Sequence, residues 1–127
     1  MPVPKYIAHL RRDAALAPII DGHGPIKLAR HNNVGLHLCR SVLGQQLSTK
    51  VARVLWARLE ALLGEGTPSL AGIAALSHEA LRGIGLSGAK ARYLHNIAAY
   101  FGEQALTDEH LHAATDEEVM SLLLPIV

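Results

Sequence analysis

One stretch decides the fold, VLGQQLSTKVARVLWARLEALLGEG, which runs from residue 42 to residue 66. Ser48 can cap the start of a helix here, because its hydroxyl accepts a hydrogen bond from a free backbone amide. Gly64 and Gly66 end that helix. Between these limits the apolar residues recur at helical spacing, and they predict an inward face that consists of Val51, Val54, Leu55, Leu59, Leu62 and Leu63.

The residues before Ser48 predict a second helix, over residues 34–43, which residues 44–47 interrupt. Gly44 favours the interruption, and two adjacent glutamines follow it. The stretch therefore predicts two helices that are joined by a short, polar turn.

Turn and capping residues elsewhere predict about seven short helices in all. Residues 5–12 and 14–21 form the first two, residues 22–25 break the chain, and residues 26–33 have no clear pattern. Farther along, Pro68 opens a helix that reaches residue 76. The remaining helices begin after the capping residues Ser77, Ser87, Thr107 and Thr115. The helix after Ser87 is expected to point Ala91, Leu94, Ile97, Ala98 and Phe101 inward.

The composition points the same way. The chain has 21 leucines and 19 alanines, both strong helix formers, so we expect an all-α protein. Its 127 residues are the size of one ordinary domain, and we expect residues 1–127 to form a single helical domain.

The formal net charge of +1 is unevenly spread along the chain. Residues 1–63 have nine lysines and arginines against three acids, whereas residues 64–127 have three against eight. A basic half suits an anionic partner such as DNA. A solvated surface of uneven charge is the alternative.

Several other classes of protein are disfavoured. No apolar run approaches the ~18 residues of a membrane span. Cys39 is the single cysteine and is expected to be buried, which fits a reducing cytoplasm without disulfides. Of the eight histidines only His110 and His112 are close in sequence, and no cysteine or carboxylate completes a ligand set with them, so we expect no metal site.

The turn at residues 44–47 is the first candidate for function. Each glutamine amide needs several hydrogen-bond partners, so Gln45 and Gln46 are costly to bury and are expected at the surface. There a glutamine can contact base edges in the minor groove or fill a gap in a base stack. Lys50 and Arg53 lie close by, and Ser48 with the backbone amides at the helix start can hold a phosphate. An ordinary turn with solvated amides is the alternative.

The second candidate is the segment LRGIGLSGAKARYL, residues 81–94. It predicts two helices joined by a tight turn, whose backbone amides can face a phosphate. Gly83-Ile84-Gly85 fits a helix–hairpin–helix turn in one register, and Gly85-Leu86-Ser87 with Lys90-Ala91 fits the helical half better in another. Plain turn chemistry remains the alternative.

These segments, in this order, resemble the helix–hairpin–helix DNA glycosylases of the 3-methyladenine II type, in the compact form without an N-terminal β-domain. Each motif is weak alone, but three in order with compatible spacing are specific, and the resemblance covers residues 9–126. The similar segments are Asp13-x-x-Leu16-x-x-Ile19-Ile20 with Gly24-Pro25, residues 42–48, and Gly85-Leu86-Ser87-x-x-Lys90-Ala91-x-x-Leu94.

The resemblance implies a compact multi-helix bundle that flips an alkylated base out of duplex DNA and hydrolyses its glycosidic bond, with a buried aspartate and no metal or other cofactor. Gln46 would fill the gap left by the flipped base, Gln45 and Leu47 would flank it, and Ser48 would begin the helix behind it. No specific role is implied for Lys90. The DNA-binding candidates are Gln45, Gln46, Leu47, Ser48, Lys50, Arg53, Gly85, Ser87 and Lys90.

The chain departs from the family at its end. In the family a Leu-Leu-x-Ile segment leads into the main hairpin and then the catalytic aspartate, whereas here only Val127 follows Ile126. Asp108 and Asp116 lie upstream, in different motifs. We therefore expect a fold that is incomplete at the C-terminus, no catalytic residue in this chain, and no activity of the chain alone. Leu122, Leu123 and Ile126 should then leave an apolar face that is covered by self-association or by a complementing chain.

Two other functions stay open. The chain can be a non-enzymatic helix–hairpin–helix-like module that binds DNA through the same turns, or a helical interaction domain that does not touch DNA. Whether it is itself an enzyme is open too, and so is the damaged base that it prefers. The expected location is the cytoplasm, or the nucleoid of a bacterial cell.

Overall fold

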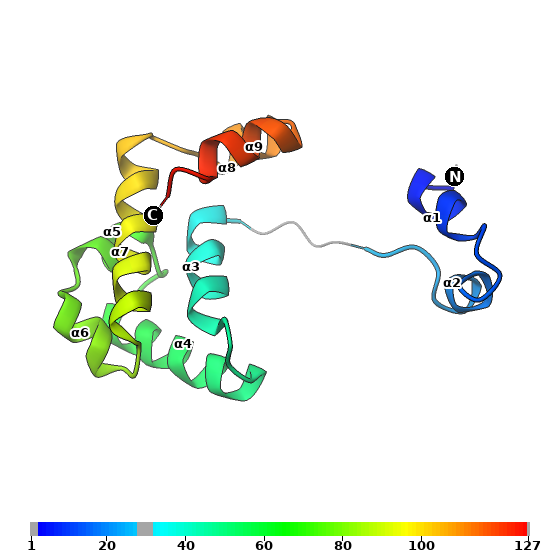
Figure 1. Cartoon of the computed structure of the whole chain (residues 1–127). Helices are drawn as coiled ribbons and strands as arrows, with labels where there is room; N and C mark the ends of the chain where they lie inside the picture. Colours follow the sequence, from blue (N-terminus) through cyan, green and yellow to red (C-terminus); the bar gives the residue numbers. More distant parts are fainter. Residues whose placement is uncertain (1–2, 28–31, 127) are drawn as a thin grey trace. The chain divides into compact units, whose positions relative to one another are not determined.

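The computed structural model describes residues 3–27 and 32–126, and every regular element among them is an α-helix (Figure 1). The chain divides into two compact units, residues 1–30 and residues 31–127. The position of one unit relative to the other is not determined, so the expected single domain over residues 1–127 stays a prediction. Leu28 to His31, in the segment without a clear pattern, and Val127 lie outside the described residues.

The described residues form nine helices, above the estimate of about seven, and each of the nine corresponds to one of the segments that the turn and capping residues predict. Their bounds are α1 Lys5–Leu10, α2 Ala17–His23, α3 Val34–Gly44, α4 Thr49–Leu63, α5 Leu70–Ala75, α6 His78–Gly83, α7 Gly88–Glu103, α8 Asp108–Ala113 and α9 Asp116–Leu123.

The helix predicted over residues 14–21 begins at Ala17 without a side-chain cap and continues to His23, so the predicted break at residues 22–25 comes only at Gly24. The predicted capping residues account for where five of the other helices begin. The side chains of Ser48, Ser77, Ser87, Thr107 and Thr115 each accept a hydrogen bond from a backbone amide three residues along. Thr115 and Glu118 bond reciprocally in a capping box. All five predicted caps are therefore confirmed. The helix predicted to open at Pro68 begins after Ser69, which caps α5.

The first unit contains α1 and α2. Ile7 is its one buried side chain among the described residues, and the Tyr6 hydroxyl accepts a hydrogen bond of 3.1 Å from the Ile26 amide. Arg11 and Asp21 form an exposed ion pair with 3.2 Å between nitrogen and oxygen. Pairs of this kind contribute little stability. The unit therefore has a small core of its own.

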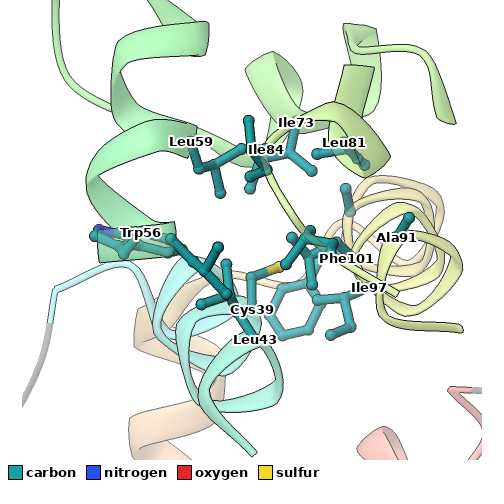
Figure 2. Packing of buried hydrophobic residues seen from close by; sticks show 14 of the residues in the cluster. Cys39, Leu43, Trp56, Leu59, Ile73, Leu81, Ile84, Ala91, Ile97 and Phe101 are labelled. Atoms are coloured by element: carbon teal, nitrogen blue, oxygen red, sulfur yellow. The ribbon is translucent and has the colours of Figure 1, made fainter. Parts of the chain in front are cut away.

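The core of the second unit is formed chiefly by α3, α4, α5, α6 and α7 (Figure 2). Helices α3 and α7 pack side by side at its centre (Figure 1). Gly35 allows the close contact, because a Cβ added there would lie 2.8 Å from a ring carbon of Phe101. The inward face predicted for α7 is confirmed, since Ala91, Leu94, Ile97, Ala98 and Phe101 are all buried.

The inward face predicted for α4 is partly wrong. Leu55 and Leu59 are buried as expected and Leu63 is half-buried, but Val51, Val54 and Leu62 are 44%, 45% and 40% exposed. Trp56 fills the core in their place and is 6% exposed. The apolar residues cover more than one side of α4, and helical spacing alone does not say which side the neighbouring helices cover.

Cys39 lies in this core and has no exposed surface. Desolvation by burial raises the pKa of its thiol to about 12, so the thiol stays protonated at neutral pH. The predicted buried cysteine is confirmed.

Side chains from distant parts of the chain bond the ends of several helices. The Arg58 guanidinium donates to the Ile84 carbonyl, at 3.0 Å, just after α6. A ring nitrogen of His95 lies 2.7 Å from the Leu76 carbonyl, just after α5. The Asp108 carboxylate accepts hydrogen bonds from the Val34 amide, at 2.7 Å, and from the Asn33 amide at the start of α3. These bonds satisfy backbone groups that a helix leaves free at its ends.

Asp108 should make the stability of this unit depend on pH. The hydrogen bonds from Val34 and Asn33 lower the pKa of its carboxyl below the ordinary value. Because the folded-state pKa is lowered, the stabilisation is present above the unfolded pKa of about 3.9 and is lost as the pH falls through the folded pKa.

We expect Asp108→Ala to lower the free energy of unfolding at pH 7 by roughly 1 kcal/mol, the usual effect of losing a helix cap. The loss of stability on acidification should also become shallower. Urea unfolding between pH 7 and pH 3 measures both, with the neighbouring Glu109→Ala as the control. Equal stability of the two variants at pH 7 would contradict the capping role.

Candidate nucleic-acid interface

The turn between α3 and α4 presents the two glutamines at the surface, as the sequence predicts. Gln45 has φ −57° and ψ 136°, and Gln46 has φ 64°. The Leu47 amide donates to the Gly44 carbonyl at 3.1 Å. These values match a type II β-turn, whose third residue has positive φ and is ordinarily glycine or asparagine.

Gln46 is therefore a strained residue at an exposed tip. A non-glycine residue in the left-handed region costs about 1–3 kcal/mol and persists where the surrounding structure imposes it. Strain of this kind is concentrated at functional sites. Both glutamine side chains are exposed, so the turn offers two amides, each with donors and an acceptor, to a partner.

The Lys90 side chain contacts the backbone of this turn. Its Nζ donates to the Gln45 carbonyl at 2.6 Å and to the Leu43 carbonyl at 2.9 Å. A cation is also favoured there by the negative end of the α3 dipole. The structure thus joins Lys90 and Gln45, which belong to two separate sequence motifs, through a direct contact.

The turn between α6 and α7 is made by Gly85, the residue that both registers of the second motif share. Gly83 is helical and belongs to α6, whereas Gly85 has φ 112° and makes the turn. Ile84 and Leu86 point into the core, where they are 8% and 3% exposed. A Cβ at Gly85 would lie 3.0 Å from a methyl group of Leu55, so this glycine also allows the turn to approach α4.

The remaining candidates have simple local surroundings. The Ser48 hydroxyl accepts from the Val51 amide at 3.2 Å, and the Ser87 hydroxyl accepts from the Lys90 amide at the same distance. Leu47, Lys50 and Arg53 are exposed at or just after the glutamine turn. Direct DNA contacts by the nine candidate residues stay a prediction.

The part of the chain that the structure describes has no buried charged or polar residue. Asp108 caps α3, and Asp116 is exposed at the start of α9. Within residues 3–27 and 32–126, no three histidine, cysteine, aspartate or glutamate side chains gather where a metal ion could bind. None of the described helices is long and apolar enough to cross a membrane.

Sequence reasoning missed the side chains that bond distant helix ends. Arg58 and His95 lie among apolar residues of α4 and α7, and a polar side chain next to an inward face is the only signal that either gives. Arg40 lies 5.5 Å from the centre of the Trp56 ring, and no spacing rule connects these two residues. The sequence does not predict that Asp108 caps α3, because an aspartate in the first turn of α8 is already explained by the dipole of that helix.

The match to a protein-family model shows which superfamily the chain belongs to. The model of the HhH-GPD superfamily base excision DNA repair proteins matches residues 39–120, which include the glutamine turn, the α6–α7 turn and most of α9. The chain belongs to this superfamily. The predicted family and the predicted all-α fold are both confirmed.

A solved structure agrees with this family. The crystal structure of a DNA-3-methyladenine glycosidase from Bacillus halodurans matches with 28% sequence identity and a TM-score of 0.78. The match covers 97% of this chain and 57% of the Bacillus chain, so the present chain spans little more than half the length of that enzyme. No curated protein matches the chain.

Proposed function

We propose that the chain is the DNA-contacting part of a 3-methyladenine-type DNA glycosylase and that it holds duplex DNA at a flipped-out alkylated base. The observation that carries this proposal is the exposed, strained Gln45–Gln46 turn in a chain of a base excision repair family. The name of the Bacillus halodurans enzyme supports the 3-methyladenine class of substrate. Duplex DNA would place the protein in the cytoplasm or nucleoid.

In the proposed complex, the Gln46 side chain enters the gap that the flipped base leaves. Its amide can donate to and accept from the unpaired base opposite. Gln45 and Leu47 contact the base pairs on either side. The backbone amides at the start of α4, which Ser48 caps, together with Lys50 and Arg53, hold phosphates near the gap.

The chain by itself is proposed to bind DNA without cleaving the glycosidic bond. A carboxylate that stabilises a cationic sugar acts from a desolvated site. In residues 3–27 and 32–126 no carboxylate is buried, and Asp108 is already bonded to two backbone amides.

Titration of two labelled duplexes tests the DNA proposal. One contains a tetrahydrofuran abasic-site analogue and the other is intact, and fluorescence anisotropy follows each at several salt concentrations. We expect tighter binding to the abasic duplex, with an affinity that falls as salt rises because phosphate contacts release counterions. The variant Lys50→Met/Arg53→Met should make the slope of log affinity against log salt shallower by about 2, one for each phosphate contact.

Arg92→Met is the charge control for this titration, since Arg92 is exposed on α7 and has no proposed contact with DNA. Affinity that does not change with salt would contradict the DNA proposal. A base-release assay on alkylated duplex tests the catalytic part separately. We expect no free base, and excision by this chain alone would overturn the proposed inactivity.

Leu122, Leu123 and Ile126, predicted to leave an apolar face, are half-buried against the core, and Leu123 and Ile126 line an open pocket of about 290 Å³ with Leu38, Val42, Tyr93 and Ile97. We propose that it takes a helical segment with an apolar face, because the Bacillus halodurans enzyme has a large part that this chain does not span. Sedimentation velocity distinguishes the occupants. A coefficient that rises with concentration supports a second copy of the chain and contradicts the proposed segment, whereas one that does not change excludes self-association as the cover.

A further inference from the structure

We propose that Lys90 is a positioning residue that fixes the conformation of the glutamine turn and so sets the direction of the Gln46 side chain. This inference rests on the proposed function, in which Gln46 enters the DNA. It assigns to Lys90 a contact inside the protein in place of a contact with phosphate.

The central peptide group of a β-turn distinguishes the two commonest turn types. Type I and type II turns have similar ends and differ by a rotation of about 180° of the central peptide group. In this turn the central peptide joins Gln45 to Gln46, and its oxygen is the Gln45 carbonyl. The orientation of that carbonyl therefore decides whether Gln46 has negative φ, as in type I, or positive φ, as in type II.

Lys90 holds this same carbonyl. Its Nζ lies 2.6 Å from the Gln45 oxygen, and hydrogen bonds from a charged donor are shorter and stronger than neutral ones. The second bond, 2.9 Å to the Leu43 oxygen, anchors the ammonium group to the last turn of α3. The ammonium group thus bridges the helix and the central peptide, and it stabilises the arrangement that gives Gln46 its φ of 64°.

The position of Lys90 is itself fixed by its own helix. Ser87 caps α7 by accepting from the Lys90 amide, and the next residue, Ala91, is buried in the core. Lys90 is half-buried. The two motifs therefore act together: one provides the glutamines, and the other provides the cation that orients them.

Nuclear magnetic resonance of the free protein tests the contact. In a type II turn the Hα of Gln45 lies close to the amide proton of Gln46, and in a type I turn it does not. We expect a strong cross-peak between these protons in the wild type and in Lys90→Arg, whose guanidinium also donates two hydrogen bonds. The cross-peak should be weak in Lys90→Met, which keeps an unbranched, flexible side chain and removes the charged donor. Arg92→Met, a charge loss elsewhere on α7, should leave it strong.

The same four proteins are then titrated with the abasic and intact duplexes. We expect the preference of Lys90→Met for the abasic duplex to fall by roughly tenfold, the size of effect that one hydrogen bond to a charged group produces. Its salt slope should equal that of the wild type, because no phosphate contact is lost. A shallower slope would instead assign Lys90 to phosphate and would overturn the inference.

The nuclear magnetic resonance measurement tests the role of Lys90, and the DNA titration tests the proposed function, so the two can fail independently. An unchanged cross-peak in Lys90→Met overturns the positioning role, whatever the DNA results are. A wild type without preference for the abasic duplex contradicts the proposed function, while the cross-peak still decides whether Lys90 sets the turn. If Lys90→Met does not fold, Lys90→Ala replaces it: a weakened cross-peak supports the inference, and an unchanged one overturns it.

Discussion

Gln46→Gly should make the protein more stable and make it a weaker binder of damaged DNA. Glycine adopts positive φ without steric strain, so the substitution removes a cost of about 1–3 kcal/mol at φ 64°. Part of this gain is offset, because glycine loses more backbone entropy on folding. We expect a net increase of up to about 1 kcal/mol in the free energy of unfolding.

The same substitution removes the amide that is proposed to enter the DNA. Hydrogen bonding of such an amide to a base edge contributes about 1–3 kcal/mol. The preference for the abasic duplex over the intact duplex should therefore fall roughly tenfold or more. Urea unfolding and the two-duplex titration measure the two effects on the same samples.

Gln46→Ala is the matched variant. Alanine also lacks the amide but keeps the strain of positive φ, so it should lose the DNA preference without gaining stability. The difference in stability between the two variants then isolates the backbone strain. If Gln46→Gly and Gln46→Ala are equally stable, the turn does not hold Gln46 at positive φ. If both keep the DNA preference, Gln46 does not fill the gap.

Leu94→Ala should cause the largest loss of stability of the changes considered. Leu94 lies on α7 at the centre of the second unit and has no exposed surface. Truncation of a fully buried leucine to alanine usually lowers the free energy of unfolding by about 2–5 kcal/mol, because it removes apolar contacts and leaves a cavity. That is a large share of the 5–15 kcal/mol that stabilise an ordinary domain.

Chemical denaturation with circular dichroism checks this expectation, and Arg92→Ala on the exposed side of α7 is the control. The control should change stability by less than about 0.5 kcal/mol, as surface substitutions do. A loss below 1 kcal/mol for Leu94→Ala would mean that α7 is not the centre of the core. Such a result would also weaken the argument that α7 fixes Lys90.

The starts of α4, α6, α7, α8 and α9 could be predicted from the sequence because the interaction that decides each of them is local. A serine or threonine hydroxyl bonds an amide only three residues away, as at Ser48 and Ser87, so the signal is complete within a few residues. The buried face of α7 could be predicted as well, since its apolar residues form one narrow stripe that leaves a single choice of inward side.

The sequence also locates the glutamine turn. Two adjacent amides next to a helix cap are costly to bury, and this cost alone predicts that Gln45 and Gln46 are exposed. The order and spacing of the motifs predicts the superfamily, which the match over residues 39–120 confirms.

Only the tertiary structure decides which side of α4 is buried and which groups of the two motifs are in contact. The broad apolar surface of α4 allows several inward sides, and the choice of Trp56 over Val51 and Val54 depends on the helices that pack against it. The bonds of Lys90 to the carbonyls of Leu43 and Gln45 join groups that lie more than forty residues apart in sequence. The positive φ of Gln46 accompanies these bonds. Local chemistry determines which residues cap a helix or avoid burial, whereas the packing of α3 against α7 determines which carbonyl the Lys90 ammonium reaches.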